Sequence, residues 1–79
     1  MDLETIVGEN VRGFRKQQGM SQDDMGRYSG LHRDFWAGIE RGERNITLET
    51  IKRIATALSV EPFILLMQGS HKWTRKGKS

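Results

Sequence analysis

The chain has 79 residues, a formal net charge of +3 and no cysteine, and 35% of its residues are hydrophobic. A chain this short forms one small domain, which buries about 60% of the surface of its unfolded state. The lack of cysteine excludes disulfides and thiolate metal sites, and it is typical of the reducing cytoplasm, where we expect this protein. No apolar run approaches the roughly 20 residues of a membrane span, so no membrane partner is predicted.

The positive charge is concentrated at the C-terminal end. Residues 1–69 carry nine Lys/Arg and ten Asp/Glu, a net charge of −1, whereas residues 70–79 carry four basic side chains and no acidic one. Any argument for nucleic-acid binding must therefore rest on where the charges lie rather than on their total. We predict a folded domain over residues 1–68 and a disordered basic tail over residues 69–79, because the tail lacks apolar periodicity.

The hydrophobic pattern predicts helices throughout and no strand. The first helix is expected over residues 3–18, where Val7, Val11 and Phe14 recur at helical spacing and form an apolar stripe. Gly13 interrupts this helix, and we interpret it as a neutral position on the exposed face. The stripe predicts that the first helix packs on a core supplied by the rest of the chain.

Residues 22–41 have the pattern of a helix-turn-helix, two short helices joined by a tight turn. Ser21 is a good N-cap for the first of them. Gly26 leaves room where the two helices touch, and Gly30 tolerates the positive φ that the turn requires. The second of them, the third helix of the chain, is expected over residues 33–41. Its outer side is left free for a partner, because the inward-facing positions of the motif are apolar: Met25, Leu31, Trp36 and Ile39.

Two more helices are expected after the helix-turn-helix. Thr47 caps a fourth helix over residues 48–58, and Pro62 begins a fifth. The fifth helix is nearly all apolar, which is more than one side of a small domain can bury, and exposed apolar patches usually mark interfaces. We therefore predict a two-fold homodimer. Its interface is expected to use some of Phe63, Ile64, Leu66 and Met67.

No arrangement typical of catalysis appears in the sequence. His32 and His71 lie far apart, and neither a Ser/His/Asp set nor a metal-ligand spacing is present. A Gly-rich phosphate loop of the P-loop type is also missing. We therefore expect a binding protein rather than an enzyme, with no cofactor and no metal ion.

The sequence resembles the phage repressor and Cro-like helix-turn-helix family, also called the XRE family. The similarity covers about residues 3–67, and the run from Gly38 to Thr47 looks most like controller proteins of restriction–modification systems. The resemblance implies an all-α, compact five-helix, lambda-repressor-like domain. It also implies a homodimer that places its third helix in the major groove of a double-stranded DNA operator. The matching runs are residues 15–22, 30–31, 38–45, 47–50 and 57–60.

The predicted function is therefore that of a sequence-specific DNA-binding transcriptional regulator. The alternative is a protein-interaction module, such as an antitoxin-like partner whose fifth helix and tail bind another protein. The contact face separates the two hypotheses. A regulator needs Arg33 and Arg44 exposed together on the recognition side, whereas an interaction module needs only an exposed apolar fifth helix.

Base contacts are expected from the third helix. Arg33 is the leading candidate, because a guanidinium can form a bidentate pair with guanine; a phosphate clamp is its alternative role. Asp34 either accepts a hydrogen bond from a cytosine amino group or orients Arg33. Ala37 suits contact with a thymine methyl group, and Gly38 permits a close approach. His32, at the N-cap, is a further candidate for base contact.

Phosphate contacts are expected around the two ends of the motif. Gln22 begins the second helix, where its amide and the free N–H groups of the first turn can both donate; a solvated helix start is the alternative. Arg44 and Asn45 follow the third helix and are the best phosphate candidates. Arg41 is a further candidate, although it could equally pair with Glu43 or Glu40.

Two further features have a structural interpretation. The resemblance maps Arg15 and Glu40 onto a partly buried salt bridge between the first and third helices, which fixes orientation more than it adds stability. Trp36 is interpreted as part of the core rather than as a platform for stacking bases. Trp73 stands alone among basic residues, either without a role or docked on a partner or DNA.

Overall fold

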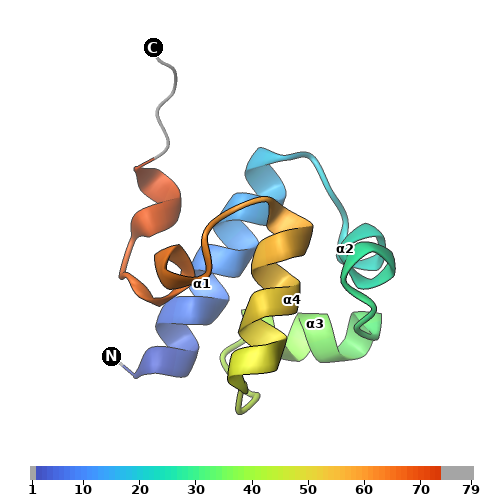
Figure 1. Ribbon diagram of the computed structural model, residues 1–79, viewed down its shortest axis with the longest axis horizontal. Helices are drawn as coiled ribbons and strands as arrows, with labels where there is room; N and C mark the ends of the chain where they lie inside the picture. The colour runs from blue at the N-terminus through green and yellow to red at the C-terminus, as the bar shows by residue number, and fades with distance from the viewer. Residues whose placement is uncertain (1, 74–79) are drawn as a thin grey trace.

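The computed structural model describes residues 2–73, which fold into a small all-helical domain (Figure 1). Four α-helices are followed by two short 3₁₀ helices. The all-α prediction is confirmed. Among residues 2–73, no helix combines the length and the apolar character that a membrane span requires. The elements are α1 (Leu3–Gln17), α2 (Gln22–Ser29), α3 (Arg33–Glu40), α4 (Leu48–Leu58), η1 (Pro62–Leu66) and η2 (Ser70–Lys72).

Local capping residues set where the helices begin. The Asp2 side chain accepts from the Thr5 amide over 2.8 Å at the start of α1. At α2, Ser21 and Asp24 form a capping box, in which each side chain accepts from the other residue's backbone N–H. Thr47 caps α4 in the same way as Asp2 caps α1. These caps satisfy N–H groups that have no partner within their own helix.

One hydrophobic core joins α1, α2, α3, α4 and η1. α1 crosses α3 closely at Gly8, where a Cβ atom would lie 2.5 Å from the carbonyl oxygen of Ile39. Trp36 is fully buried in this core, as predicted, and fixes α3 to the other helices. The buried residues are Val7, Val11, Phe14, Met25, Trp36, Ile39, Ile51, Ile54, Ala55, Leu58 and Leu65.

The expected fifth α-helix is instead the 3₁₀ helix η1, so the five-helix count is wrong. Asn10 of α1 is fully buried and donates to the carbonyl oxygens of Leu65 over 3.0 Å and Met67 over 2.9 Å. Met67 has extended backbone angles, which end the helix after a single 3₁₀ segment. Asn10 thus satisfies the Leu65 carbonyl in place of a further helical turn, and it shares the Met67 carbonyl with the N–H of Ser70 at the start of η2.

The chain after η1 folds back onto α1, where the expectation was a disordered tail from residue 69. η2 packs against α1, and Figure 1 shows this red segment beside the blue helix. The His71 ring contacts Phe14 edge-on, and its Nδ1 lies 2.9 Å from Oδ1 of Asn10. Trp73 remains largely exposed. The predicted tail therefore has an ordered beginning, and the rest of it, residues 74–79, lies outside the described residues.

α1 and η2 are in close contact at Gly13, so the interpretation of Gly13 as a neutral exposed position is wrong. A Cβ atom at Gly13 would lie 2.2 Å from Cδ2 of the His71 ring. No real side chain tolerates such a distance, so any larger residue at Gly13 must displace His71. The glycine therefore provides the space in which the C-terminal segment docks.

Candidate nucleic-acid interface

The turn between α2 and α3 is fixed by its two glycines. Gly30 has φ of 76°, in the left-handed region that glycine favours, and its N–H donates to the Gly26 carbonyl over 3.0 Å. A Cβ atom at Gly26 would lie 2.8 Å from the carbonyl oxygen of Leu31, so the two helices touch there. The hydroxyl of Ser29 accepts from the Leu31 amide. The turn holds α3 at a set angle to α2.

The first turn of α3 is exposed and polar. His32 is the N-cap, and its Nδ1 accepts from the Asp34 amide over 3.0 Å, so histidine performs the capping role usual for serine or aspartate. Arg33 and Asp34 have 60% and 74% of their side chains exposed, and Arg33 Nε lies 3.9 Å from Asp34 Oδ1. A contact this long and exposed leaves both groups available to a partner.

The side of α3 that faces the core is fully buried, whereas burial varies along the opposite side. Trp36 and Ile39 are fully buried, whereas Ala37 is half-buried. Gly38 was expected to allow the close approach of a partner. The structure instead covers it with the side chain of Arg44, whose Nε lies 2.8 Å from where a Cβ at Gly38 would be.

The end of α3 is closed by a Schellman motif. Gly42 has φ of 73°, its N–H donates to the Ile39 carbonyl, and the N–H of Glu43 donates to the Gly38 carbonyl, both over 3.0 Å. Arg41 pairs with Glu43 over 2.9 Å, which decides between the two partners considered for it. Asn45 is exposed in the loop that follows. The loop therefore begins at a fixed position relative to α3.

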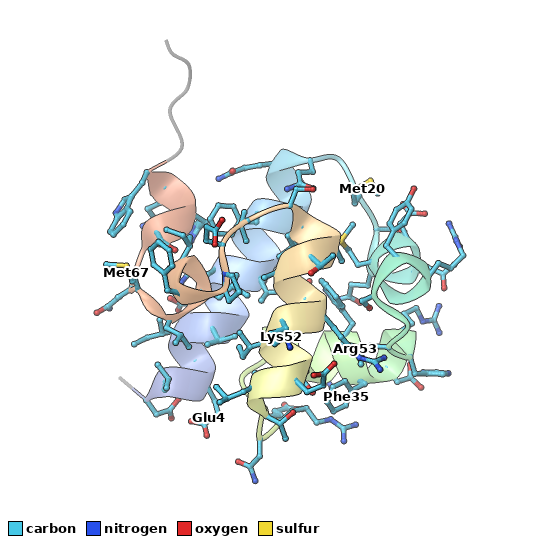
Figure 2. All side chains as sticks on the ribbon, in the orientation of Figure 1. Glu4, Met20, Phe35, Lys52, Arg53 and Met67 are labelled. Carbon is cyan, nitrogen blue, oxygen red and sulfur yellow. The ribbon has the colours of Figure 1, made fainter. Side chains whose placement is uncertain are left out.

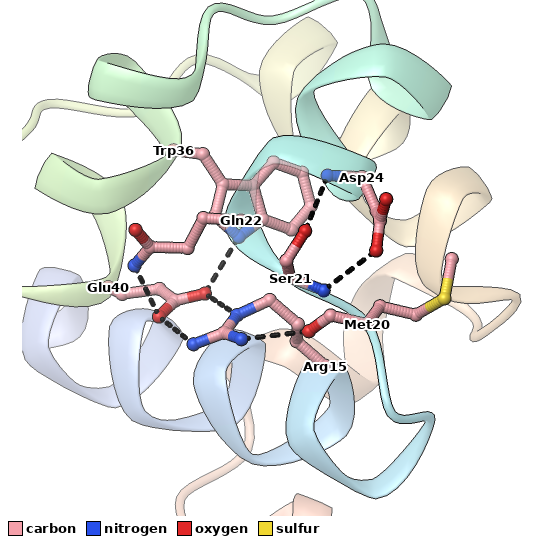
Figure 3. Close-up of polar contacts among 7 residues, drawn as sticks. All are labelled: Arg15, Met20, Ser21, Gln22, Asp24, Trp36 and Glu40. Atoms are coloured by element: carbon pink, nitrogen blue, oxygen red, sulfur yellow. Dashed lines mark hydrogen bonds and ion pairs between the residues drawn. The ribbon is translucent and has the colours of Figure 1, made fainter.

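Glu40 joins α1, α2 and α3, as Figure 3 shows. Arg15 donates from Nε to Oε2 over 2.6 Å and from Nη2 to Oε1 over 2.9 Å, and this is the salt bridge that the resemblance implied. Gln22 donates to Oε1 over 3.0 Å, and the Trp36 indole N–H donates to Oε2 over 2.7 Å. Arg15 also donates to the carbonyl of Met20 in the α1–α2 loop. The network fixes the orientation of α3 relative to α1 and α2.

The charge of Glu40 is stabilised despite its burial. Burial alone would raise the pKa of the Glu40 carboxyl, but the hydrogen bonds from Arg15, Gln22 and Trp36 hold this pKa below its ordinary value. The hydrogen bond to Glu40 is also the chief reason that the pKa of Arg15 lies above its usual value. The two groups remain an ion pair at neutral pH.

Gln22 has an internal partner that its sequence position did not indicate. Its amide group, proposed as a phosphate donor, is directed at Glu40, and the residue is half-buried.

The site also includes Phe35, which the sequence analysis missed. The Arg44 guanidinium carbon lies 5.2 Å from the centre of the Phe35 ring. In the sequence, Phe35 and Gly38 are three residues apart and therefore lie on the same side of α3, which was the available sign that a side chain could cross the helix there.

The residues expected at a dimer interface are mostly exposed. Phe63 is 57% exposed, and Leu66 and Met67 are also exposed, whereas Ile64 packs partly against the core. In Figure 2, Met67 lies at the left edge of the molecule, whereas Phe35 lies in its lower right part, near Arg53. Within residues 2–73, no three His, Cys, Asp or Glu side chains gather closely enough to hold a metal ion.

Comparison with known proteins gives consistent results. A family model described as helix-turn-helix matches residues 11–65. The control protein C.SmaI of Serratia marcescens is 43% identical over 70 residues, which span 87% of this chain and 83% of the relative.

Solved structures share both the fold and the sequence. The restriction–modification controller protein C.AhdI from Aeromonas hydrophila has a TM-score of 0.76 at 40% identity, covering 78% of this chain and 94% of its own. The C.Esp1396I tetramer, solved in complex with its natural 35 base-pair operator, has a TM-score of 0.76 at 31% identity, covering 82% and 86%. The chain therefore belongs to the helix-turn-helix family, in the group of small regulators that includes the restriction–modification controller proteins.

Proposed function

We propose that this protein is a sequence-specific transcriptional regulator that binds an operator as a homodimer, with α3 in the major groove. The exposed first turn of α3, carried on a helix whose opposite side is anchored in the core, is the observation that supports this function. Helix-turn-helix proteins present the N-terminal residues of this helix to base edges. The relative C.Esp1396I, which has the same fold, was solved in complex with its natural operator, and this supports operator binding by the present chain.

The proposed contacts follow the geometry of the site. His32, Arg33, Asp34 and Ala37 face base edges, with Arg33 paired to a guanine. Arg41, Arg44 and Asn45 meet the backbone beyond the end of α3, because phosphate contacts position a protein without reading sequence. Gln22 contributes its backbone N–H at the start of α2, since its side-chain amide is held by Glu40. We infer that the protein acts in the cytoplasm and that this function needs no catalytic group.

The alternative function, a protein-interaction module, has less support. Its requirement, an exposed apolar segment after α4, is met by Phe63, Leu66 and Met67, but a homodimer uses the same surface. It gives no reason for the exposure of Arg33 and Arg44.

Selection of bound sequences from a random pool of DNA duplexes tests the proposal. We expect enrichment of a palindromic sequence whose half-sites lie about 34 Å apart, one turn of DNA. Recovery of sequences without a shared pattern, at an affinity equal to that of the starting pool, would reject sequence-specific regulation in favour of the interaction module.

A further inference from the structure

Arg44 lies against the recognition helix rather than extending from its loop. Its guanidinium carbon stands 5.2 Å from the centre of the Phe35 ring, within the range of a cation–π contact. Phe35 is itself partly buried and packs against the core, so its ring is a fixed support. An arginine at the fourth position after the end of a helix would otherwise be one of the most mobile side chains of a surface loop.

Gly38 completes the support beneath Arg44. The three heavy atoms nearest to a Cβ built at Gly38 all belong to the Arg44 side chain, at 2.8 Å for Nε, 3.0 Å for Cγ and 3.4 Å for Cδ. The arginine stem therefore crosses α3 where the helix has no side chain. The Gly38 carbonyl also accepts the N–H of Glu43, which fixes the backbone immediately before Arg44.

No acidic side chain competes for Arg44 in the described part of the chain. Glu43, its neighbour, is paired with Arg41, and no carboxylate among residues 2–73 forms a salt bridge with Arg44. The contacts with Phe35 and Gly38 thus hold the side chain while leaving its charge uncompensated, as binding to an anion requires.

We propose that Phe35 and Gly38 are positioning residues, which together form a cradle that holds Arg44 on the surface of α3 as part of the DNA-contacting face. This inference rests on the proposed function. Preorganisation of this kind lowers the entropy lost when a long side chain is immobilised on binding. Gly38 therefore matters because it makes room for Arg44, not because it admits DNA.

A double-mutant cycle in the full-length protein tests the cradle. Gly38→Ala and Phe35→Leu are each combined with Arg44→Ala, and equilibrium affinity is measured for the selected duplex. Each single substitution should weaken binding about two- to fivefold, the equivalent of an exposed cation–π contact. Neither should weaken binding further when Arg44 is already alanine. A loss that persists in the Arg44→Ala background would overturn the cradle, because the residue would then act on DNA or on the fold directly.

Two controls separate positioning from folding. Phe35→Tyr keeps the ring and should keep the affinity of the wild type. Gly38→Ala should not destabilise the fold, because alanine is favoured over glycine within a helix and the atoms that must move belong to the exposed Arg44 side chain, not to the backbone. An affinity loss that tracks a fall in melting temperature would contradict the proposal.

A measurement without DNA distinguishes failure of the cradle from failure of the proposed function. In the free protein, the Arg44 Hδ protons should show an upfield ring-current shift that disappears in Phe35→Leu. The same shift with no binding to any duplex would reject the proposed function and leave the cradle intact. Random-coil shifts for Arg44 in the wild type would show that the cradle does not form.

Discussion

Gln22, the first residue of α2, donates its side-chain amide to Glu40, the last residue of α3, over 3.0 Å. The bond joins the two helices of the motif at the ends that their connecting turn does not hold. Arg15 and Trp36 donate to the same carboxylate, so three segments of the chain meet at one buried charge. The angle at which α3 is presented therefore depends on Glu40 as well as on the turn.

Glu40→Gln should be strongly destabilising. The Glu40 side chain is 4% exposed and that of Arg15 is 12% exposed, so the substitution leaves a buried guanidinium without its counter-charge. We expect a loss of about 3–5 kcal/mol in the free energy of unfolding, measured by urea denaturation. Glu43→Gln, which breaks the exposed pair with Arg41, is the matched control and should change stability by less than about 1 kcal/mol. Equal effects of the two substitutions would show that the Glu40 network does not support the fold.

The stability of the fold should depend on pH through Glu40. The pKa of this carboxyl lies below its ordinary value of 4.5 in the folded state, so its contribution is fully present above pH 4.5 and is lost as pH falls through the lowered folded value. Asp2 and Asp24 also have lowered pKa values, through hydrogen bonds with Thr5 and Ser21 respectively, and they add to the acid sensitivity of every variant. The wild type should therefore lose more stability below pH 4.5 than Glu40→Gln does. Parallel stability curves for the two proteins would contradict the assignment.

Gly13→Ala should release η2 from α1. Alanine within a helix is normally more stable than glycine by up to about 1 kcal/mol, but here the new methyl group would collide with the His71 ring. We expect Gly13→Ala to be destabilising in the wild type and stabilising in a His71→Gly background, as measured by thermal unfolding, because only glycine removes both the ring and the His71 Cβ, which would lie 2.8 Å from the new methyl group. Stabilisation in both backgrounds would mean that the C-terminal segment does not dock at Gly13.

Phe63→Asp should prevent dimerisation without unfolding the domain. The side chain is 57% exposed in the single chain, so its replacement changes few internal contacts. In sedimentation experiments at tens of micromolar, roughly where weak dimers of −6 to −8 kcal/mol persist, the wild type should be dimeric and Phe63→Asp monomeric. Tyr28→Asp, at an exposed position on α2, should remain dimeric. A wild type that is monomeric under these conditions would count against the interface.

The local features of this structure could be predicted from the sequence. Helix starts follow from caps such as Ser21 and Thr47, and the turn follows from Gly30, because each depends on residues a few positions away. The conversion of the fifth helix to η1 was not predictable in this way, since it depends on Asn10, 55 residues before its acceptor Leu65.

The candidate site also has features that could be predicted from the sequence and one that could not. The exposure of Arg33 at the start of α3 follows from helical periodicity, and the resemblance supplied the pair of Arg15 with Glu40. The position of Arg44 over Phe35 depends on how the loop returns across the helix, which no local pattern specifies. Long-range contacts of this kind decide which polar groups remain available to a partner.

The role of Arg44 differs from that of Arg33 in a measurable way. Arg44→Ala should weaken binding to all duplexes alike, because phosphates are the same in every sequence, and it should reduce the slope of log K against log salt by about 0.9. Lys52→Ala, at an exposed α4 position beside Glu49, is the control and should leave the slope unchanged. An unchanged slope for Arg44→Ala would show that Arg44 contacts no phosphate.

The affinity ratio between the selected duplex and a random duplex, compared for the wild type and Arg33→Ala, tests sequence-specific recognition by α3 most directly. Loss of a bidentate contact with guanine should weaken binding to the selected duplex by about 1–3 kcal/mol and leave binding to the random duplex nearly unchanged, so the ratio falls. An equal loss for both duplexes would contradict base recognition by Arg33 and make it a phosphate contact.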